Sequence, residues 1–427
     1  MTADADVIAA AQAVLRTNDL GGYTKPSPRL YPHQWNWDSA LAAIGWAHVD
    51  WERAVREVDS LLAGQWVNGM LPAIRYNPNA VDYFPGPEWW PNVPVRRAGE
   101  ITNGISQPPV LPSAVYLVGL LQPVEAVRRQ WWGRIYAPLR DALLYFPRHR
   151  TVVGSPLLAI LHPWESGLDN SPRWDFAVRK GYRPSRPYRR RDTTVIHPAE
   201  RPVDADYDLY MYLVEQIASS GYEVGPRLAE APFAVYDALF NAIWYRGAAD
   251  LNRIAQALGI AAAVSEADLR DFHDAYHATL WHAEAGLFRD FDVTGQSQIP
   301  VDTVAGLGAI WGGLVDAGQA AAILARYRSR SAACRMVPST PPSEPAFDPS
   351  RYWRGPAWVN INWFLARGLE ALGLSTEARA LADATLDLVR SAGIYEYFHA
   401  YTGEGLGGSE FTWTAALGLD LLRCPVT

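Results

Sequence analysis

The chain has 427 residues, of which 49% are hydrophobic, and its formal net charge is −7. The acidic balance argues against a protein that binds nucleic acid or an anionic membrane, and no stretch approaches the ~18 consecutive apolar residues of a transmembrane helix. The length exceeds a typical domain of roughly 100–200 residues. Because no linker, like-charge block or low-complexity run divides the chain, we expect one large domain over residues 1–427.

The two cysteines, Cys334 and Cys424, form no metal-binding motif and fit unpaired thiols in a reducing compartment. The N-terminus is acidic and lacks the basic and apolar regions of a signal peptide. We therefore expect a cytoplasmic protein without a bound metal or cofactor. The sequence does not determine the oligomeric state and leaves a homo-oligomer open.

Helical patterns recur along the whole chain, and alternating β-branched stretches are few. One helix is expected to start near Asp38 or Ser39, either of which could cap it, and Trp281 to Phe288 resembles a helix end and a glycine turn. The other predicted helices are 5–17, 51–63, 110–121, 124–146, 206–219, 224–246, 248–259, 266–283, 302–314, 316–328, 374–390 and 412–423, with one more starting within 352–363. About twelve main helices without a sequence repeat suit an all-α (α/α)6 barrel, whose active site lies at one end.

Two long segments, 64–107 and 176–203, interrupt the helices. Structureless loops longer than ~12–15 residues are usually functional or disordered, and aromatic residues in the first segment argue against disorder. The second segment contains five arginines among prolines and tyrosines, and we expect most of them to form surface ion pairs. Both insertions are predicted to form a rim that covers the substrate. The aromatic residues of the first segment are Tyr76, Tyr83, Phe84, Trp89 and Trp90, and the arginines of the second are Arg183, Arg186, Arg189, Arg190 and Arg191.

Residues 162–175, His-Pro-Trp-Glu-Ser-Gly-Leu-Asp-Asn-Ser-Pro-Arg-Trp-Asp, predict a loop in which Asp169 is flanked by Trp164 and Trp174. A carboxyl group beside aromatic walls loses water, which raises its pKa. A general acid that works near neutral pH needs this property. The acidic residues of such a loop could instead be ordinary turn formers and helix caps, but the indoles are costly in a plain solvated turn.

Aromatic residues also gather where helices are expected to begin. Residues 30–40, Leu-Tyr-Pro-His-Gln-Trp-Asn-Trp-Asp-Ser-Ala, bring three aromatic rings to one helix entrance. Residues 352–363, Tyr-Trp-Arg-Gly-Pro-Ala-Trp-Val-Asn-Ile-Asn-Trp, do the same, with Pro356 suited to a first helical turn. The chain has 18 Trp and 21 Tyr, many in apparent loops. Because indole faces stack on the C–H faces of sugars, these residues indicate a carbohydrate site.

The acid-loop pattern Trp-Glu-Ser-Gly-x-Asp-Asn-Ser-x-x-Trp resembles the general-acid loop of glycoside hydrolase family 63. Within that family the chain is most similar, over nearly its whole length, to short bacterial enzymes that hydrolyse glucosylglycerate or mannosylglycerate. The resemblance implies an (α/α)6 barrel and an inverting mechanism, with Asp169 as the acid. Of the later candidates Glu396, Glu404 and Glu410, it favours Glu396 as the base, because 395–405 is similar to the family's Glu-x-Tyr/Phe-x-x-x-Thr-Gly element.

The resemblance also implies residues that bind the substrate. Arg201 and Tyr207 match positions that hold the carboxylate of glycerate, for which a guanidinium can supply two parallel hydrogen bonds. Ile-Ser-Gln-Pro-Pro at 105–109 resembles a family element that places Gln107 near the sugar. The remaining predicted substrate-binding residues are Tyr31, Trp35, Trp37, Asp38, Tyr83, Trp164, Asn170, Tyr352, Trp353, Trp358 and Trp413.

The resulting prediction is an inverting α-glycosidase that cleaves a small glycoside of glycerate, with no nucleic-acid or membrane partner. Three alternatives stay open: an α-glucosidase or trehalase-like enzyme on neutral oligosaccharides, a sugar epimerase with histidine bases, and a non-catalytic sugar-binding protein. The sequence contains no Gly-x-Ser-x-Gly elbow, Walker loop, dinucleotide-binding turn or His-Glu-x-x-His pair. His162 and His399 flank the two carboxylates and are more often structural in such positions.

Overall fold

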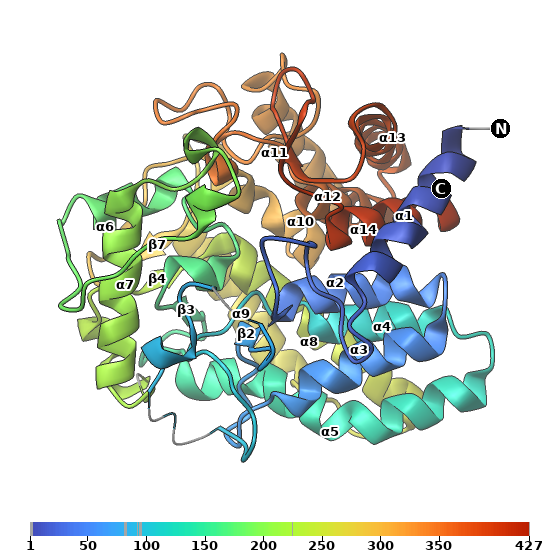
Figure 1. Cartoon of the computed structure of the whole chain (residues 1–427), viewed down its shortest axis with the longest axis horizontal. Coiled ribbons are helices and arrows are strands. Elements are labelled where there is room, and N and C mark those ends of the chain that lie inside the picture. The colour runs from blue at the N-terminus through green and yellow to red at the C-terminus, as the bar shows by residue number, and fades with distance from the viewer. Residues whose placement is uncertain (1–2, 81–82, 92, 94–95, 224, 427) are drawn as a thin grey trace.

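The computed structural model describes residues 3–80, 83–91, 93, 96–223 and 225–426 (Figure 1). Within these residues, six helices form a closed inner ring, in which each helix packs on the next and the last packs against the first. In order around the ring they are α2 (Asn36–Ala47), α4 (Leu111–Leu120), α8 (Ala238–Leu258), α10 (Gly308–Gly312), α12 (Val359–Ala371) and α14 (Thr412–Arg423).

An outer helix precedes each inner helix in the chain and completes the second layer of the barrel. The outer helices are α1 (Ala3–Asn18), α3 (Trp51–Ala63), α5 (Glu125–His149), α9 (Glu266–Leu280), α11 (Ala317–Ser329) and α13 (Ser375–Ala392). The helix α6 (Asp175–Val178), at the start of the second insertion, and the helix α7 (Asp204–Ser219), directly after it, lie outside both layers (Figure 1). The predicted (α/α)6 barrel is therefore confirmed. Among the helices described, none is both long and apolar enough to cross a membrane.

The inner helices pack closely because small residues line their contacts. In α2, every residue from Asn36 to Trp46 is buried. A Cβ atom at Gly45 would lie 2.5 Å from Ala416 of α14, a separation too short for any side chain. The ring closes between α2 and α14 because position 45 carries no side chain.

In the part of the chain that the structure describes, four small antiparallel sheets connect the loops, and the sequence analysis predicted none of their strands. The largest has the order β3-β4-β7-β8. Its strands are β3 (Ala159–Ile160), β4 (Val235–Tyr236), β7 (Phe291–Asp292) and β8 (Ser297–Gln298). The other pairs are β1 (Gln34–Trp35) with β2 (Ile74–Arg75), β5 (Trp281–His282) with β6 (Leu287–Phe288), and β9 (Tyr395–Phe398) with β10 (Gly405–Ser409). Runs of two to five residues are too short to show a period of two.

Several predicted helix boundaries were wrong. The helices predicted at 224–246 and 248–259 are a 3-10 turn, a strand and the single helix α8, because the Asp237 carboxylate caps α8 by accepting a hydrogen bond from the Phe240 N–H (2.8 Å). The predicted glycine turn at 281–288 is the β5–β6 hairpin. Helix α2 begins at Asn36, so Asp38 lies within its first turn and is not a cap. Helix α12 begins at Val359, so Pro356 precedes it.

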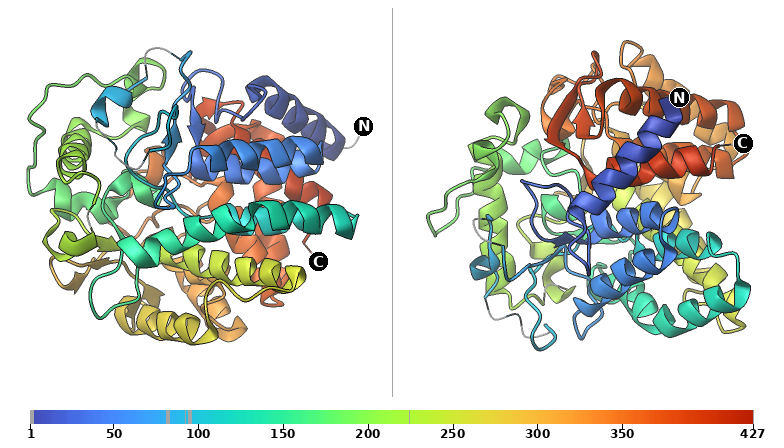
Figure 2. Two further views of the ribbon diagram at one scale, coloured as in Figure 1. Left: turned by 90° about the horizontal axis from the view of Figure 1, so that it is seen from below. Right: turned by 45° about the vertical axis from the view of Figure 1, so that its right-hand side comes forward.

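The long loops and both insertions gather at one end of the helices, as Figure 2 shows from two further directions. The insertions touch each other: the Phe84 ring stacks on Tyr188 (5.7 Å between centroids), and the Arg186 guanidinium lies 4.0 Å over the Trp89 ring. Arg183 forms the expected surface ion pair, with Asp208. The cavity described next lies beneath these contacts.

Candidate active site

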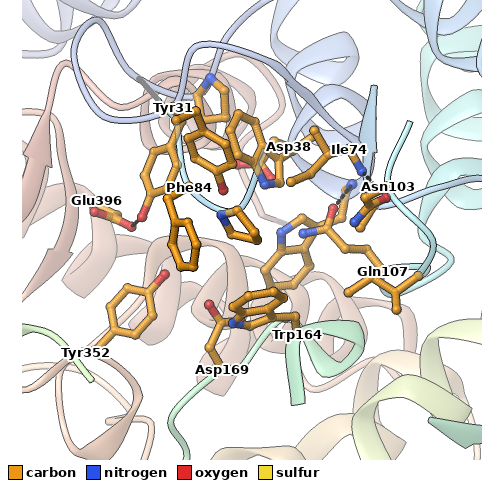
Figure 3. Close-up of a pocket in the computed structure, with 18 of the residues that line it drawn as sticks. Tyr31, Asp38, Ile74, Phe84, Asn103, Gln107, Trp164, Asp169, Tyr352 and Glu396 are labelled. Atoms are coloured by element: carbon orange, nitrogen blue, oxygen red, sulfur yellow. Dashed lines mark hydrogen bonds between the residues drawn. The ribbon is translucent and has the colours of Figure 1, made fainter. Parts of the chain in front are cut away.

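A cavity opens among these loops and contains about 790 Å³ of space outside protein atoms, including its mouth (Figure 3). Its walls come from parts of the chain far apart in sequence, which only the closed barrel brings together. Of the predicted site residues, those that line it are Tyr31, Trp35, Trp37, Asp38, Tyr83, Gln107, Trp164, Asp169, Arg201, Tyr207, Tyr352, Glu396 and Trp413.

Three predicted substrate-binding residues, Asn170, Trp353 and Trp358, are not among the lining residues. The Trp353 and Trp358 rings stack on each other at 3.6 Å, and the Trp358 indole donates a hydrogen bond to the Tyr352 carbonyl (3.1 Å). The Asn170 side-chain oxygen accepts from the Trp353 N–H (3.0 Å). These residues therefore support Tyr352 and the acid loop from behind the cavity wall.

The acid loop presents Asp169 to the cavity in a fixed position. The Asp169 carbonyl accepts a hydrogen bond from the Tyr210 hydroxyl (2.8 Å). Gly167 has a φ of 73°, and a Cβ atom there would lie 2.6 Å from the Trp37 ring, so the turn requires glycine. Trp164 lines the cavity, but Trp174 is buried behind the loop, where its indole donates to the Leu168 carbonyl (3.0 Å). One of the two expected aromatic walls is thus present.

The surroundings of Asp169 favour its protonated form. Burial raises the pKa of Asp169 from 3.8 to about 8. The nearby positive charge of Arg201 opposes this rise, and the negative charge of Glu396 adds to it. A carboxyl group with this pKa carries its proton at neutral pH and can give it away.

Glu165 anchors the acid loop to the segment that carries Gln107. Its buried carboxylate accepts hydrogen bonds from the Ser106 N–H (3.0 Å) and hydroxyl (2.8 Å) and forms an ion pair with Arg150 (2.9 Å). The Gln107 side-chain oxygen accepts from the Trp37 N–H (3.2 Å). One buried carboxylate, to which the sequence analysis gave no role in the site, thereby holds two predicted parts of the site together.

Glu396 lies on β9, 1% exposed, and its carboxyl group lines the cavity beside Tyr31 (Figure 3). Its carboxylate accepts hydrogen bonds from the Tyr31 hydroxyl (2.9 Å) and the Gly408 N–H (3.0 Å). Burial raises the pKa of Glu396, while Arg201 and these two hydrogen bonds hold the rise back. Glu404 and Glu410 are exposed and do not line the cavity.

The two histidines beside the carboxylates shape turns. The buried His162 ring accepts a hydrogen bond from the Trp164 N–H (3.0 Å), and burial lowers the pKa of His162 to about 4, so it is neutral. The His399 ring accepts from the backbone N–H groups of Tyr401 (3.3 Å) and Thr402 (3.2 Å). Neither is among the residues that line the cavity.

The Arg201 cation shares the cavity with three carboxyl groups. Burial raises the pKa of Asp38 well above its usual range, and the charges of Glu396 and Asp169 add to the rise. The Arg201 guanidinium lies 4.2 Å over the Tyr352 ring, and its Nη1 lies 3.3 Å from the Tyr31 hydroxyl and 4.0 Å from a Glu396 oxygen. Arg201 therefore places a positive charge inside the cavity, close to the predicted base Glu396.

Several lining residues were missed or assigned only to the rim. Phe84, Pro85 and Trp90 reach the cavity from the first insertion, and Phe411 reaches it from the turn before α14. The sequence indicated them only through the many aromatic residues of these loops. That pattern does not show whether a residue lies at the rim of the cavity or in its wall. Asn103 also lines the cavity, and its side chain accepts from the Ile74 N–H (2.9 Å). A lone asparagine in a loop carries no sequence signal for this role.

A possible cluster of metal ligands lies away from this site. His48, Asp420 and Cys424 have ligand atoms within 4.8 Å of one another. The Asp420 carboxylate already accepts hydrogen bonds from Arg367 (2.7 Å) and the Trp363 indole (2.7 Å), and it lies 2.9 Å from the His48 Nε2. These contacts tie the last helix to the barrel and explain the cluster without a metal.

The (α/α)6 barrel and its cavity of carboxyl groups and aromatic walls agree with the class of glycoside hydrolases, and comparison with known proteins shows this class. The family model for the mannosylglycerate hydrolase MGH1-like glycoside hydrolase domain matches residues 31–414. The chain belongs to this family.

Two relatives and one solved structure illustrate the similarity. Mannosylglycerate hydrolase of Rubrobacter radiotolerans is 40% identical, over 98% of this chain and 97% of its own length. Glucosylglycerate hydrolase of Mycolicibacterium hassiacum is 33% identical, over 97% of each chain. The crystal structure of the glycoside hydrolase family 63 mannosylglycerate hydrolase from Thermus thermophilus, in complex with Tris and D-glycerate, has a TM-score of 0.91 and 36% identity, covering 97% of this chain and 99% of that one.

Proposed function

We propose that this enzyme hydrolyses a small α-glycoside of glycerate, glucosylglycerate or mannosylglycerate, to free sugar and glycerate with inversion at the anomeric carbon. The observation that carries the proposal is the placement of Asp169, with a pKa of about 8, and the buried Glu396 around one cavity that also holds the Arg201 guanidinium. The substrate class is supported by the two relatives, one named a mannosylglycerate hydrolase and the other a glucosylglycerate hydrolase. The D-glycerate in the Thermus structure supports it as well.

In the proposed mechanism Asp169 and Glu396 act on opposite sides of the anomeric carbon. Asp169 donates its proton to the glycosidic oxygen as the bond between that oxygen and the anomeric carbon breaks, and glycerate leaves as the alcohol. Glu396 takes a proton from a water molecule whose oxygen forms the new bond to carbon. Inversion needs room for this water, so we expect the two carboxyl groups to lie roughly 6.5–9.5 Å apart.

The cavity divides into a sugar end and an acceptor end in this proposal. The acid-loop tryptophan Trp164, the ring of Trp37 and the amide of Gln107 bind the sugar. Arg201 and Tyr207 hold the carboxylate of glycerate. Because the Arg201 Nε already donates to Asp192 (3.2 Å), the glycerate carboxylate has to use the terminal nitrogens of the guanidinium.

We further propose that residues 1–427 act as one catalytic unit, with the insertions 64–107 and 176–203 covering the bound substrate. Phe84 and Pro85 from the first insertion and Arg201 from the end of the second line the cavity, which supports this role. Both cysteines are free thiols, which fits action in the cytoplasm.

The test compares hydrolysis of glucosylglycerate, mannosylglycerate, the neutral glycosyl-glycerols and trehalose. We expect turnover of at least one glycerate glycoside with a higher kcat/KM than its glycerol counterpart. NMR from the start of the reaction should show the β-anomer of the free sugar first. Preference for the neutral substrates would favour the oligosaccharide alternative, and first release of the α-anomer would refute inversion.

A further inference from the structure

Asp192, in the second insertion, joins two arginines at the acceptor end of the cavity. It is 8% exposed and lies at the start of a 3-10 turn (Asp192–Thr194). One carboxylate oxygen accepts from the Arg201 Nε (3.2 Å) and from the Arg190 Nη2 (2.8 Å). The other oxygen accepts from the Arg190 Nε (3.1 Å). The order of the charges is therefore Arg190, Asp192, Arg201, with Arg201 facing the cavity.

Arg201 lies between two carboxylates that compete for it. Its Nε is 3.2 Å from Asp192, whereas its Nη1 is 4.0 Å from Glu396. Attraction between opposite charges increases as they approach. Without Asp192, the guanidinium would therefore move toward Glu396 and pair with the predicted base. With Asp192 in place, the guanidinium stays over the Tyr352 ring, 4.2 Å from it.

Arg190 shares the carboxylate of Asp192 with Arg201. Arg190 was expected to form a surface ion pair, but its side chain is only 11% exposed and it holds Asp192 with two parallel hydrogen bonds. Because Arg190 binds both oxygens of Asp192 and Arg201 binds only one of them, Asp192 neutralises the charge of Arg201 only in part. The Arg190 guanidinium also lies 4.2 Å over the ring of Tyr207, the other residue of the acceptor end.

We propose that Asp192 is a positioning residue that determines specificity for glycosides with an anionic acceptor, by holding the Arg201 guanidinium away from Glu396 and open to the acceptor carboxylate. The inference rests on the proposed function, because it needs a substrate with a carboxylate. Burial would raise the pKa of Asp192, but Arg190 and Arg201 outweigh burial and lower it, so the carboxylate stays ionised at neutral pH.

The test is Asp192→Asn, which keeps the shape and removes the charge. The substrates are the glycerate glycoside that the wild type hydrolyses best and its neutral glycosyl-glycerol counterpart. We expect KM for the glycerate glycoside to rise about tenfold or more, since a charged hydrogen bond is lost from the group that binds it. The neutral counterpart should change less than about threefold, because it has no carboxylate to hold.

The pH profile gives a second readout that a merely structural role would not move. In Asp192→Asn, Arg201 pairs more closely with Glu396 and stabilises its ionised form. The acidic limb of the kcat profile should therefore shift to lower pH. The matched control is Asp204→Asn: Asp204 is 87% exposed and also pairs with Arg190 (2.9 Å), but it does not contact Arg201. The control should keep the wild-type selectivity and profile.

Equal losses on both substrates, with an unmoved acidic limb, would overturn the inference, as would the same selectivity change in Asp204→Asn. If Asp192→Asn does not fold, Arg190→Gln replaces it: Asp192 then neutralises Arg201 alone, and selectivity for the glycerate glycoside should fall. Unchanged selectivity in a folded Arg190→Gln variant would contradict the inference. A wild type that hydrolyses no glycerate glycoside refutes the proposed function instead, so the two failures are distinguishable.

Discussion

Replacing Asp169 by asparagine should abolish activity and stabilise the protein at neutral pH. The folded-state pKa of Asp169, about 8, lies above its usual value of 3.8. The folded protein therefore binds this proton more tightly than the unfolded chain does, and the contribution to stability is fully present below about pH 4 and is lost as the pH rises toward about 8. Asparagine is neutral at every pH and avoids this loss.

The size of the effect follows from the pKa shift. One pKa unit corresponds to about 1.4 kcal/mol, so a carboxyl group that stays protonated to about pH 8 lowers the free energy of unfolding at pH 7 by up to about 4 kcal/mol relative to pH 4. Asp169 is only partly buried. Because water in the cavity solvates the carboxylate, we expect about half of this limit, about 2 kcal/mol, as the gain in Asp169→Asn at pH 7.

The assay is urea unfolding of the wild type and Asp169→Asn at several values between about pH 4 and about pH 8.5, which bracket the shifted titration. The difference in free energy of unfolding should be near zero at the lowest pH and grow toward the highest. Glu404→Gln is the control, because Glu404 is exposed and does not line the cavity; its stability difference should not follow the pH in this way. A constant difference between Asp169→Asn and the wild type would refute the reasoning, and retained hydrolysis would remove Asp169 from the mechanism.

Three further predictions follow from the site. Arg201→Ala should raise KM for glycerate glycosides strongly, because a charged hydrogen bond worth about 1.5–3 kcal/mol is lost. KM for the neutral glycosyl-glycerol should change much less, and an equal rise in both KM values would refute the role of Arg201. Glu396→Gln should stop turnover but leave substrate binding by calorimetry largely intact, and near-normal turnover would return Glu404 and Glu410 to consideration. Hydrogen exchange in 64–107 and 176–203 should slow when D-glycerate and the product sugar bind. Unchanged exchange would contradict closure of the two insertions over the bound substrate.

The parts of the molecule that could be predicted from the sequence are those with a local signal. Helical periodicity identified most of the ring helices, and an acidic residue among tryptophans, glycine and proline identified the loop of Asp169. A helix prediction failed over 225–236, where the structure has a 3-10 turn and the short strand β4, which pairs with the distant strands β3 and β7. The direction in which an aromatic side chain points also depends on distant neighbours. Tyr352 lines the cavity, whereas Trp358, from the same motif, stacks on Trp353 behind the cavity wall.

Asp192 illustrates the limit for charged residues. It lies in a loop without periodicity, among five arginines, and any of them could be its partner. The choice depends on how the second insertion folds over the barrel, which brings Arg201 and Arg190 to the same carboxylate oxygen. An isolated acidic residue in a basic segment suggests a surface ion pair, so only the three-dimensional arrangement reveals the buried contact.

The contacts of the two carboxyl groups also bear on which is the acid and which is the base. Glu396 is buried and Asp169 is partly buried, and loss of water favours the protonated form of each. Glu396 receives hydrogen bonds on both carboxylate oxygens, from Tyr31 and Gly408, and lies 4.0 Å from Arg201. Burial raises the pKa of Tyr31 well above its usual range, so its hydroxyl stays protonated and keeps donating. These contacts stabilise the ionised form of Glu396, while Asp169 holds its proton to about pH 8. Hydrogen bonds to both oxygens of Glu396 favour its ionised form, as a base requires, and the raised pKa of Asp169 favours its protonated form, as an acid requires.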